Sequence, residues 1–104
     1  MVTVKVLTNN KSIQSIQVRG HAEYADPGQD LVCAGASSIG IGALNGLDEL
    51  FNEDVHLEIK DNSILIQVLN PKDELQTVLK FLMEQYKTMA EVYPNNIQIV
   101  WKEV

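Results

Sequence analysis

The chain has 104 residues, of which 45% are hydrophobic and 21% are charged, and its formal net charge is −6. This size and composition are typical of one folded domain with its own core, and they exclude a disordered chain. Only 8 lysine and arginine residues are present, and sequence-independent nucleic-acid binding relies on such cations. Composition therefore predicts a single domain over residues 1–104, a basic partner and no direct contact with nucleic acid.

Cys33 is the single cysteine, so the chain forms no internal disulfide. The first residues lack the basic and then apolar pattern of a secretory signal. The uncharged run 31–47 contains serines, an asparagine and four glycines, whereas a membrane-spanning helix needs about 20 predominantly large apolar residues. We therefore expect a cytoplasmic protein with a reduced thiol and no membrane span.

Alternating apolar and polar residues predict two strands at the start of the chain, Val2 to Val6 and Ile13 to Val18, with a turn at 9–11. The apolar spacing changes between Ile13 and Ile16, which indicates either a β-bulge or a strand start assigned out of phase. Residues 20–30 show no apolar periodicity and include Asp26-Pro27-Gly28, a tight-turn signal. We expect this segment to be a loop, and residues 22–29 to gate the site described below.

Apolar residues recur every three or four positions from Leu31 to Phe51. This pattern predicts a helix that is apolar nearly all round and hence largely buried. Each of its four glycines costs the helix roughly 0.5–1 kcal/mol relative to alanine. We expect a sheet or a partner subunit to approach the helix closely and offset that cost.

The rest of the chain repeats the pattern of two strands and a helix. Alternation predicts strands at 55–60 and 64–68, and Asn70-Pro71 predicts the start of an amphipathic helix, with Asn70 as its N-cap, that ends at Tyr93-Pro94. A final strand follows from Ile97. The fold predicted is α+β in the order β-β-α-β-β-α-β, with about five strands and two helices in two or three layers.

The beginning of the first helix holds the residues that suit chemistry. Cys33 lies in the first turn of the predicted helix, where unpaired N–H groups favour a thiolate, and the N–H groups of Cys33 and Ala34 would face the oxyanion of an acyl-transfer intermediate. His21 lies upstream at the mouth of the loop and is a candidate general base. Asp30 either orients the imidazole or caps the helix. Ser37 is one turn beyond Cys33 and either supports the site or bonds to the Cys33 carbonyl.

Two other interpretations of these residues remain open from their types alone. A lone cysteine in an apolar run is commonly a small buried hydrophobe. His21, Asp30 and Cys33 are also ligand types that could hold zinc with an open position. Three scattered ligand types are weak support for zinc, so we predict no metal and no other cofactor.

The segments Gly20-His21-Ala22 and Asp30-Leu31-Val32-Cys33-Ala34-Gly35-Ala36-Ser37 resemble the signature of the Prp family, ribosomal-processing cysteine proteases of Firmicutes and related bacteria. The resemblance implies a cytosolic, homodimeric α/β endopeptidase. It also implies a substrate, the precursor of a large-subunit ribosomal protein, from which the enzyme removes a short N-terminal extension that ends in a Phe-rich motif.

Position by position, the resemblance implies that Cys33 is the nucleophile and His21 the catalytic histidine. Gly20, Asp30 and Ser37 match residues that surround the family's site. The alternative function is a non-catalytic ribosome-assembly or protein-binding module, in which Cys33 belongs to the core and His21 has no chemical role.

Overall fold

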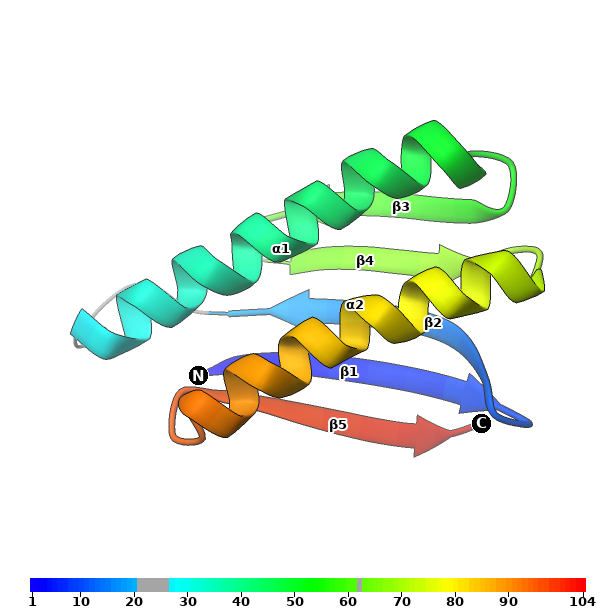
Figure 1. The fold of residues 1–104 in the computed structure, drawn as a ribbon. Helices are drawn as coiled ribbons and strands as arrows, with labels where there is room; N and C mark the ends of the chain where they lie inside the picture. The colour runs from blue at the N-terminus through cyan, green and yellow to red at the C-terminus, as the bar shows by residue number, and fades with distance from the viewer. Residues whose placement is uncertain (21–26, 62) are drawn as a thin grey trace.

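The computed structural model describes residues 1–20, 27–61 and 63–104. In this part of the chain the elements follow the predicted order (Figure 1). The strands are β1 (Val2–Asn9), β2 (Ser12–Arg19), β3 (Val55–Lys60), β4 (Ser63–Val68) and β5 (Ile97–Glu103), and the helices are α1 (Pro27–Phe51) and α2 (Asp73–Val92).

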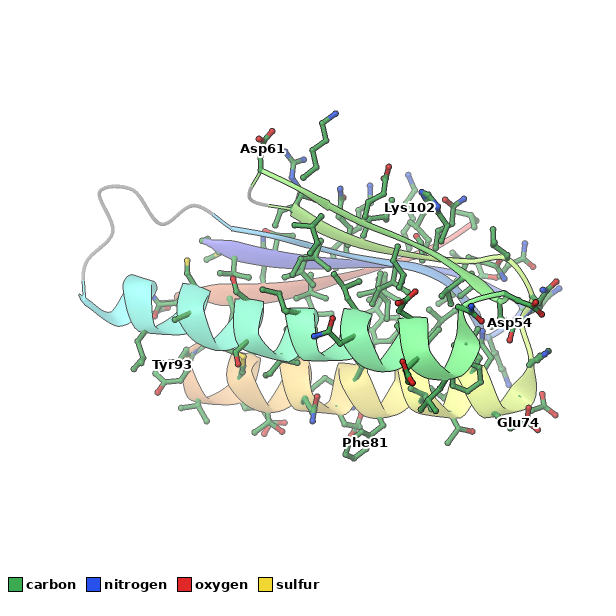
Figure 2. The ribbon with its side chains drawn as sticks, turned by 90° about the horizontal axis from the view of Figure 1, so that it is seen from above. Asp54, Asp61, Glu74, Phe81, Tyr93 and Lys102 are labelled. Carbon is green, nitrogen blue, oxygen red and sulfur yellow. The ribbon has the colours of Figure 1, made fainter. Side chains whose placement is uncertain are left out.

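The strands form one mixed sheet in the order β3-β4-β2-β1-β5. β1 and β5 are parallel, and the other neighbouring pairs are antiparallel. Both helices lie side by side on the same face of this sheet, α1 nearer β3 and β4, and α2 across the other strands (Figures 1 and 2). The described part of the chain therefore forms two layers, and none of its helices lies on the opposite face of the sheet.

The first hairpin contains a β-bulge, which is one of the two explanations that the apolar spacing allows. Thr8 pairs with Ile13 whereas Leu7 pairs with Ser15, so one extra residue lies in β2. The Ile13 N–H donates to Gln76 Oε1 at 2.7 Å, and Gln76 Nε2 donates to the Ile13 carbonyl at 2.9 Å. The buried Gln76 side chain thus satisfies the Ile13 backbone where the bulge disturbs the ladder.

The core lies between the sheet and the two helices. Its strand residues are those that alternate toward the helices, and its helix residues lie on the sides that face the sheet. The fully or nearly fully buried members include Val2, Val4, Val6, Ile13, Ile16, Val32, Ala36, Leu47, Ile66, Leu75, Leu79, Met83, Tyr86 and Ile97. The Tyr86 hydroxyl donates to the Ala36 carbonyl at 3.0 Å and links α2 to α1.

The prediction for the start of α1 is wrong. The helix begins at Pro27 rather than Leu31, so Pro27 and Gly28 are helical and do not form a turn. Proline is favoured at the first helical position, because its missing N–H would have no partner within the helix and its φ is already helical. Asp30 lies inside the helix and is not its N-cap. Residues 27–29 of the predicted gate belong to α1, and residues 22–26 lie outside the described residues.

The expectation that α1 is largely buried is also wrong. Only 28% of its most apolar stretch, within Leu31–Phe51, is buried, because the sheet covers one side of the helix and no second layer of described residues covers the other. By length and hydropathy alone this stretch would suffice to cross a membrane, a test that core helices of soluble proteins also pass. Leu31, Ile41 and Leu50 are among its exposed apolar side chains.

The glycines of α1 differ in what surrounds them. A Cβ at Gly40 would lie 2.7 Å from Ile64 Cδ1 and 3.0 Å from the Tyr86 hydroxyl oxygen, so the predicted close approach exists there. Nothing lies within 4 Å of a Cβ built at Gly42 or Gly46. Close packing therefore explains the first of these three glycines and not the other two.

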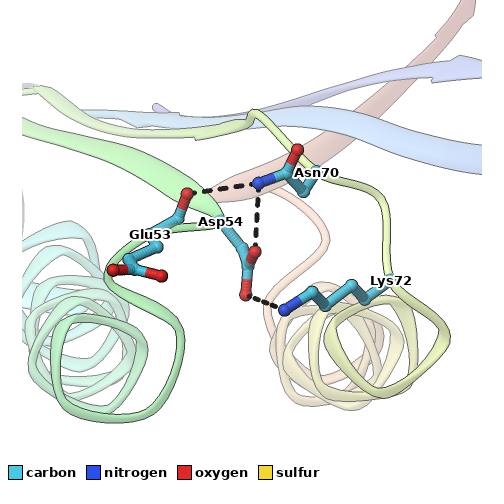
Figure 3. Close-up of polar contacts among 4 residues, drawn as sticks. All are labelled: Glu53, Asp54, Asn70 and Lys72. Carbon is cyan, nitrogen blue, oxygen red and sulfur yellow. Dashed lines mark hydrogen bonds and ion pairs between the residues drawn. The ribbon is translucent and has the colours of Figure 1, made fainter.

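The start of α2 also differs from the prediction. The helix begins at Asp73, and Lys72 rather than Asn70 occupies the N-cap position. Asn70 Nδ2 instead donates to Asp54 Oδ1 at 3.1 Å and to the Glu53 carbonyl at 3.3 Å (Figure 3). Asp54 is buried, and Lys72 Nζ approaches its second oxygen at 3.3 Å. This cluster ties the turn after α1 to the connection before α2.

Candidate active site

A cavity of about 160 Å³ opens where the end of β2, the first turns of α1 and the turn between β3 and β4 meet. Its apolar wall consists of Val2, Val18, Ala36, Ile41, Ile59 and Ile64, and the remaining lining comes from Gly20, Cys33, Ser37, Asp61 and Ser63. The structure thus brings three of the predicted residues, Gly20, Cys33 and Ser37, to one place. The cavity is close in size to the roughly 150 Å³ that holds one benzene ring in a protein interior.

Gly20 lies directly against the thiol. A Cβ at this position would be 3.7 Å from Cys33 Sγ and 3.0 Å from Val2 Cγ2. The φ of Gly20 is not positive, so space rather than backbone conformation favours glycine here. The end of β2 therefore passes beside the sulfur just before the chain continues to His21.

Cys33 is partly exposed on the side of α1 that borders the cavity. Because α1 begins at Pro27, Cys33 lies in its second turn and not in its first. In a helix, the N–H groups at such positions bond to the carbonyls four residues earlier. The structure therefore does not support the prediction that the N–H groups of Cys33 and Ala34 are available for an oxyanion.

Ser37 follows Cys33 by one helical turn, so both residues border the cavity from the same side of α1. Ser37 is exposed to solvent. This position does not distinguish the two roles that the sequence leaves open for Ser37, support of the site and a hydrogen bond to the Cys33 carbonyl.

Two of the predicted residues are not tested by the structure. His21 lies outside the described residues, and for Asp30 only the backbone is described, as part of α1. The zinc alternative depends on both side chains. Among the residues that the structure describes, no group of three His, Cys, Asp or Glu side chains is placed to hold a metal ion.

The turn between β3 and β4 contributes residues that the sequence analysis missed. Asp61 has a φ of 53° in this turn, and Asp61 and Ser63 both line the cavity. Arg19 pairs with Ser63 because β2 and β4 are neighbours, and the turn is thereby brought beside Gly20. The sequence shows this segment only as a turn, since its place at the site depends on the strand order.

One buried ionisable group lies behind the site. Burial raises the pKa of the Tyr86 phenol well above its usual range, so Tyr86 remains a neutral hydrogen-bond donor to the Ala36 carbonyl. Ala36 itself lines the cavity. The phenol thus fixes the part of α1 that carries Cys33 and Ser37 without taking a place among the residues that a substrate would touch.

Comparison with known proteins places this geometry in a family. The family model described as cysteine protease Prp matches residues 1–98. The ribosomal processing cysteine protease Prp of Staphylococcus aureus is 30% identical and covers 98% of this chain and 100% of its own. Its counterpart in Mycoplasma pneumoniae is 35% identical over 83% of this chain and 85% of its own.

Solved structures agree with the sequence comparison. The S. aureus protease in complex with a substrate peptide superposes with a TM-score of 0.89 at 28% identity, covering 98% of this chain and 100% of that one. The same protease with a covalently linked product peptide gives a TM-score of 0.85 at 29% identity and the same coverage. The fold, the cavity with its cysteine and these matches agree: the chain belongs to the cysteine protease Prp family, and it is a cysteine protease.

Proposed function

We propose that this protein is an endopeptidase in which Cys33 is the nucleophile and His21 the general base, and that it removes an N-terminal extension from a large-subunit ribosomal protein. The observation that carries the proposal is the position of Gly20 beside the Cys33 thiol. A Cβ at Gly20 would lie 3.7 Å from Sγ, and His21 is the next residue. The names of the S. aureus and M. pneumoniae relatives, ribosomal processing proteases, support the substrate class.

The chemistry follows from a thiol beside a base. His21 takes the proton of Cys33, and the sulfur attacks the scissile carbonyl carbon to form a tetrahedral intermediate. The C–N bond then breaks, the leaving amine receives the proton from His21, and a thioester joins the acyl group to Cys33. Water, activated by the same imidazole, hydrolyses the thioester and restores the thiol.

The cavity supports a preference for a large apolar side chain next to the scissile bond. Its walls are mainly valine and isoleucine, and its volume of about 160 Å³ suits one phenyl ring. Ile41 and Ile59 are its accessible apolar members, at 45% and 64% exposure, so a bound side chain would cover apolar surface that is otherwise in water. This agrees with the Phe-rich motif that the family resemblance implies.

The proposal also includes the location and oligomeric state of the protein, a homodimer in the cytoplasm. The helical layer supports association because exposed apolar side chains occur on both helices, among them Leu31 and Leu50 on α1, and Val78 and Phe81 on α2. Sedimentation velocity should show a dimer that Phe81→Ser weakens. A chain that sediments as a monomer at about 100 μM, far above typical dissociation constants of specific complexes, would contradict this part of the proposal.

The decisive experiment compares peptide cleavage by the native protein and three variants. The substrate is a peptide that spans the extension of the ribosomal protein and its junction. Cys33→Ala should abolish cleavage, and His21→Ala should lower kcat/KM by about 10²–10⁴-fold. His56→Ala is the matched control, because His56 is the other histidine and lies exposed in β3, and its rate should stay within about twofold of native. Mass spectrometry of the native protein should detect the acyl adduct on Cys33. Cleavage retained by Cys33→Ala would overturn the assignment of the nucleophile.

A further inference from the structure

The uncovered face of the sheet concentrates positive charge in a chain that is negative overall. The side chains that alternate away from the helices include Lys5 in β1, Arg19 in β2, Lys60 in β3 and Lys102 in β5, all of them exposed. These four are half of the 8 lysine and arginine residues of the chain. Figure 2 shows Lys102 and other nitrogen-bearing side chains on the side of the sheet away from the helices.

Strand pairing fixes the arrangement of these cations. Arg19 lies opposite Ser63, which pairs with Lys60, so Lys60 and Arg19 belong to one row across the sheet. Arg19 also pairs with Thr3, two residues before Lys5, which makes Arg19 and Lys5 diagonal neighbours about 7–8 Å apart. Lys102 pairs with Leu7 and is displaced from Lys5 in the same way. The four cations thus form a diagonal path across the face, and we call them the basic path.

Few groups on this face oppose the charge of the basic path. Glu58 is the one carboxylate among the residues of β3, β4, β2 and β1 that alternate to this side, and it pairs with His56 at 3.6 Å. Asp61, in the turn directly after Lys60, is a second carboxylate on the side away from the helices (Figure 2). Among the residues that the structure describes, no member of the basic path forms an ion pair. By contrast, Lys72 and Lys87 on the helical side pair with Asp54 and Glu84.

The face is also hollowed and polar. A depression of about 380 Å³ is lined by Met1, Thr3, Lys5, Gln17 and Arg19. Around it, the outward side chains of β4, β2, β1 and β5 are mostly hydroxyls and amides, whereas Leu7, Leu65 and Val100 are the apolar ones. Protein interfaces have an apolar core depleted of charge, while interfaces with nucleic acid are polar and positively charged. If two copies of the chain met through this face, the cations of one copy would lie against the cations of the other and repel them.

We propose that the basic path binds the phosphate backbone of RNA, with a phosphate between Lys5 and Arg19 in the depression. The net charge of −6 argues against an RNA partner only if the charges are spread evenly over the surface. In this protein half of the cations lie together on the uncovered face of the sheet. The choice of RNA over other polyanions rests on the proposed ribosomal substrate. Ser63 borders both the basic path and the cavity, so bound RNA would lie beside the site. Among the described residues, this face presents no helix that could enter a groove, and its outward strand side chains include no aromatic ring. Contact is therefore with phosphates and independent of sequence.

The test is fluorescence anisotropy with a labelled oligouridylate of about 20 nucleotides, which spans a site of roughly 4–16 nucleotides. Four phosphate contacts predict that log K falls with log salt at a slope of about −3, since each contact contributes about −0.7 for a single strand. The double variant Lys5→Gln/Lys102→Gln should halve this slope and weaken binding at 50 mM salt by about tenfold or more. Peptide cleavage should not change, so this result is separate from that of the proposed protease activity.

The matched control is Lys80→Gln/Lys87→Gln, which removes the same charge from α2. It should bind the oligonucleotide as the native protein does. The proposal is overturned if both double variants weaken binding equally, if the native protein does not bind at 50 mM salt, or if polyglutamate competes as well as unlabelled RNA. A change of sedimentation in Lys5→Gln/Lys102→Gln with unchanged RNA binding would instead identify the face as an interface between copies of this chain.

Discussion

Replacement of Gly20 by alanine tests whether the end of β2 must pass directly beside the thiol. The added methyl group would lie 3.0 Å from Val2 Cγ2, closer than ordinary van der Waals contact, and 3.7 Å from Cys33 Sγ, at ordinary contact distance. Val2 is almost fully buried and has little room to move, so the backbone at residue 20 must shift by a few tenths of an ångström. The methyl group would also cover one side of the sulfur.

The size of the effect follows from these two contacts. Overpacking in a core costs about 1–3 kcal/mol, and the restriction of the unfolded chain by alanine returns about 0.4–1 kcal/mol. The free energy of unfolding should therefore fall by about 1 kcal/mol, or roughly 4–8 °C in Tm. A displacement of 1 Å at a reacting group costs about 10²-fold in rate, so the smaller shift here should lower kcat/KM by roughly tenfold.

Two assays and one control separate crowding of the thiol from general damage. Peptide cleavage and the rate of Cys33 alkylation by iodoacetamide, followed by intact mass, should both fall in Gly20→Ala. Gly35→Ala adds a methyl group to α1 two residues from Cys33, but it meets only the flexible end of Met89 at 3.2 Å, and both rates should stay within about twofold of native. If Gly20→Ala also keeps both rates within twofold, the close approach of β2 to the sulfur has no role in catalysis.

Three further predictions concern the bulge, the cavity and the edge of the sheet. Gln76→Leu should lower the free energy of unfolding by about 2–4 kcal/mol in urea titrations, because it leaves the buried N–H and carbonyl of Ile13 without their partner. Ile59→Ser should raise KM for a Phe-containing peptide about tenfold with little change in stability, because Ile59 lines the cavity and is mostly exposed. Hydrogen bonds from Thr8 and Asn10 hold the pKa of Glu103 below its ordinary value of 4.5. The contribution of Glu103 to the free energy of unfolding should therefore be complete above pH 4.5 and disappear as the pH falls through the lowered pKa. NMR titration measures this pKa directly.

Each of these predictions has its own control. Gln67→Leu changes an exposed amide on the uncovered face and should alter stability by less than about 0.5 kcal/mol; an equal loss in both variants would refute the role of Gln76. Leu69→Ser removes an exposed leucine away from the cavity, and KM should not respond to it. In Thr8→Val the pKa of Glu103 should rise toward its ordinary value, and an unchanged titration would show that the hydroxyl has no influence.

The order of elements could be predicted because it depends on local patterns. Alternation fixes which residues of β1 and β4 face the helices, and the change of spacing after Ile13 offers the bulge as one of two explanations. The place of Gly20 among the residues around Cys33 is what the family resemblance implies, and no local pattern shows it. The start of α1 could not be placed, because Pro27 suits both a turn and a first helical position, and tertiary context decides between them.

The exposure of α1 could not be predicted for a different reason. Periodicity shows which residues could be buried, but the number of layers decides which of them are. Val32 and Ala36 face the sheet and are buried, whereas Leu31 and Ile41 belong to the same apolar helix and remain exposed. Because both helices lie on one face of the sheet, α1 has one side against the sheet and one side open to solvent. Its apolar residues occur on both sides, so each side suits contact with other apolar groups.

The strand order determines what surrounds the thiol. β2 ends at Arg19, and the next residue, Gly20, lies beside Cys33. The antiparallel pairing of β2 with β4 places Ser63 opposite Arg19. The turn that contains Asp61 must therefore border the cavity, although nearly 30 residues separate it from Cys33 along the chain. Because Arg19 and Lys60 project from the same row to the uncovered face, this single pairing also joins the active-site end of the sheet to the basic path. A shift of one residue between β2 and β4 would reverse which face each side chain occupies, so the cavity wall and the basic path depend on the same register.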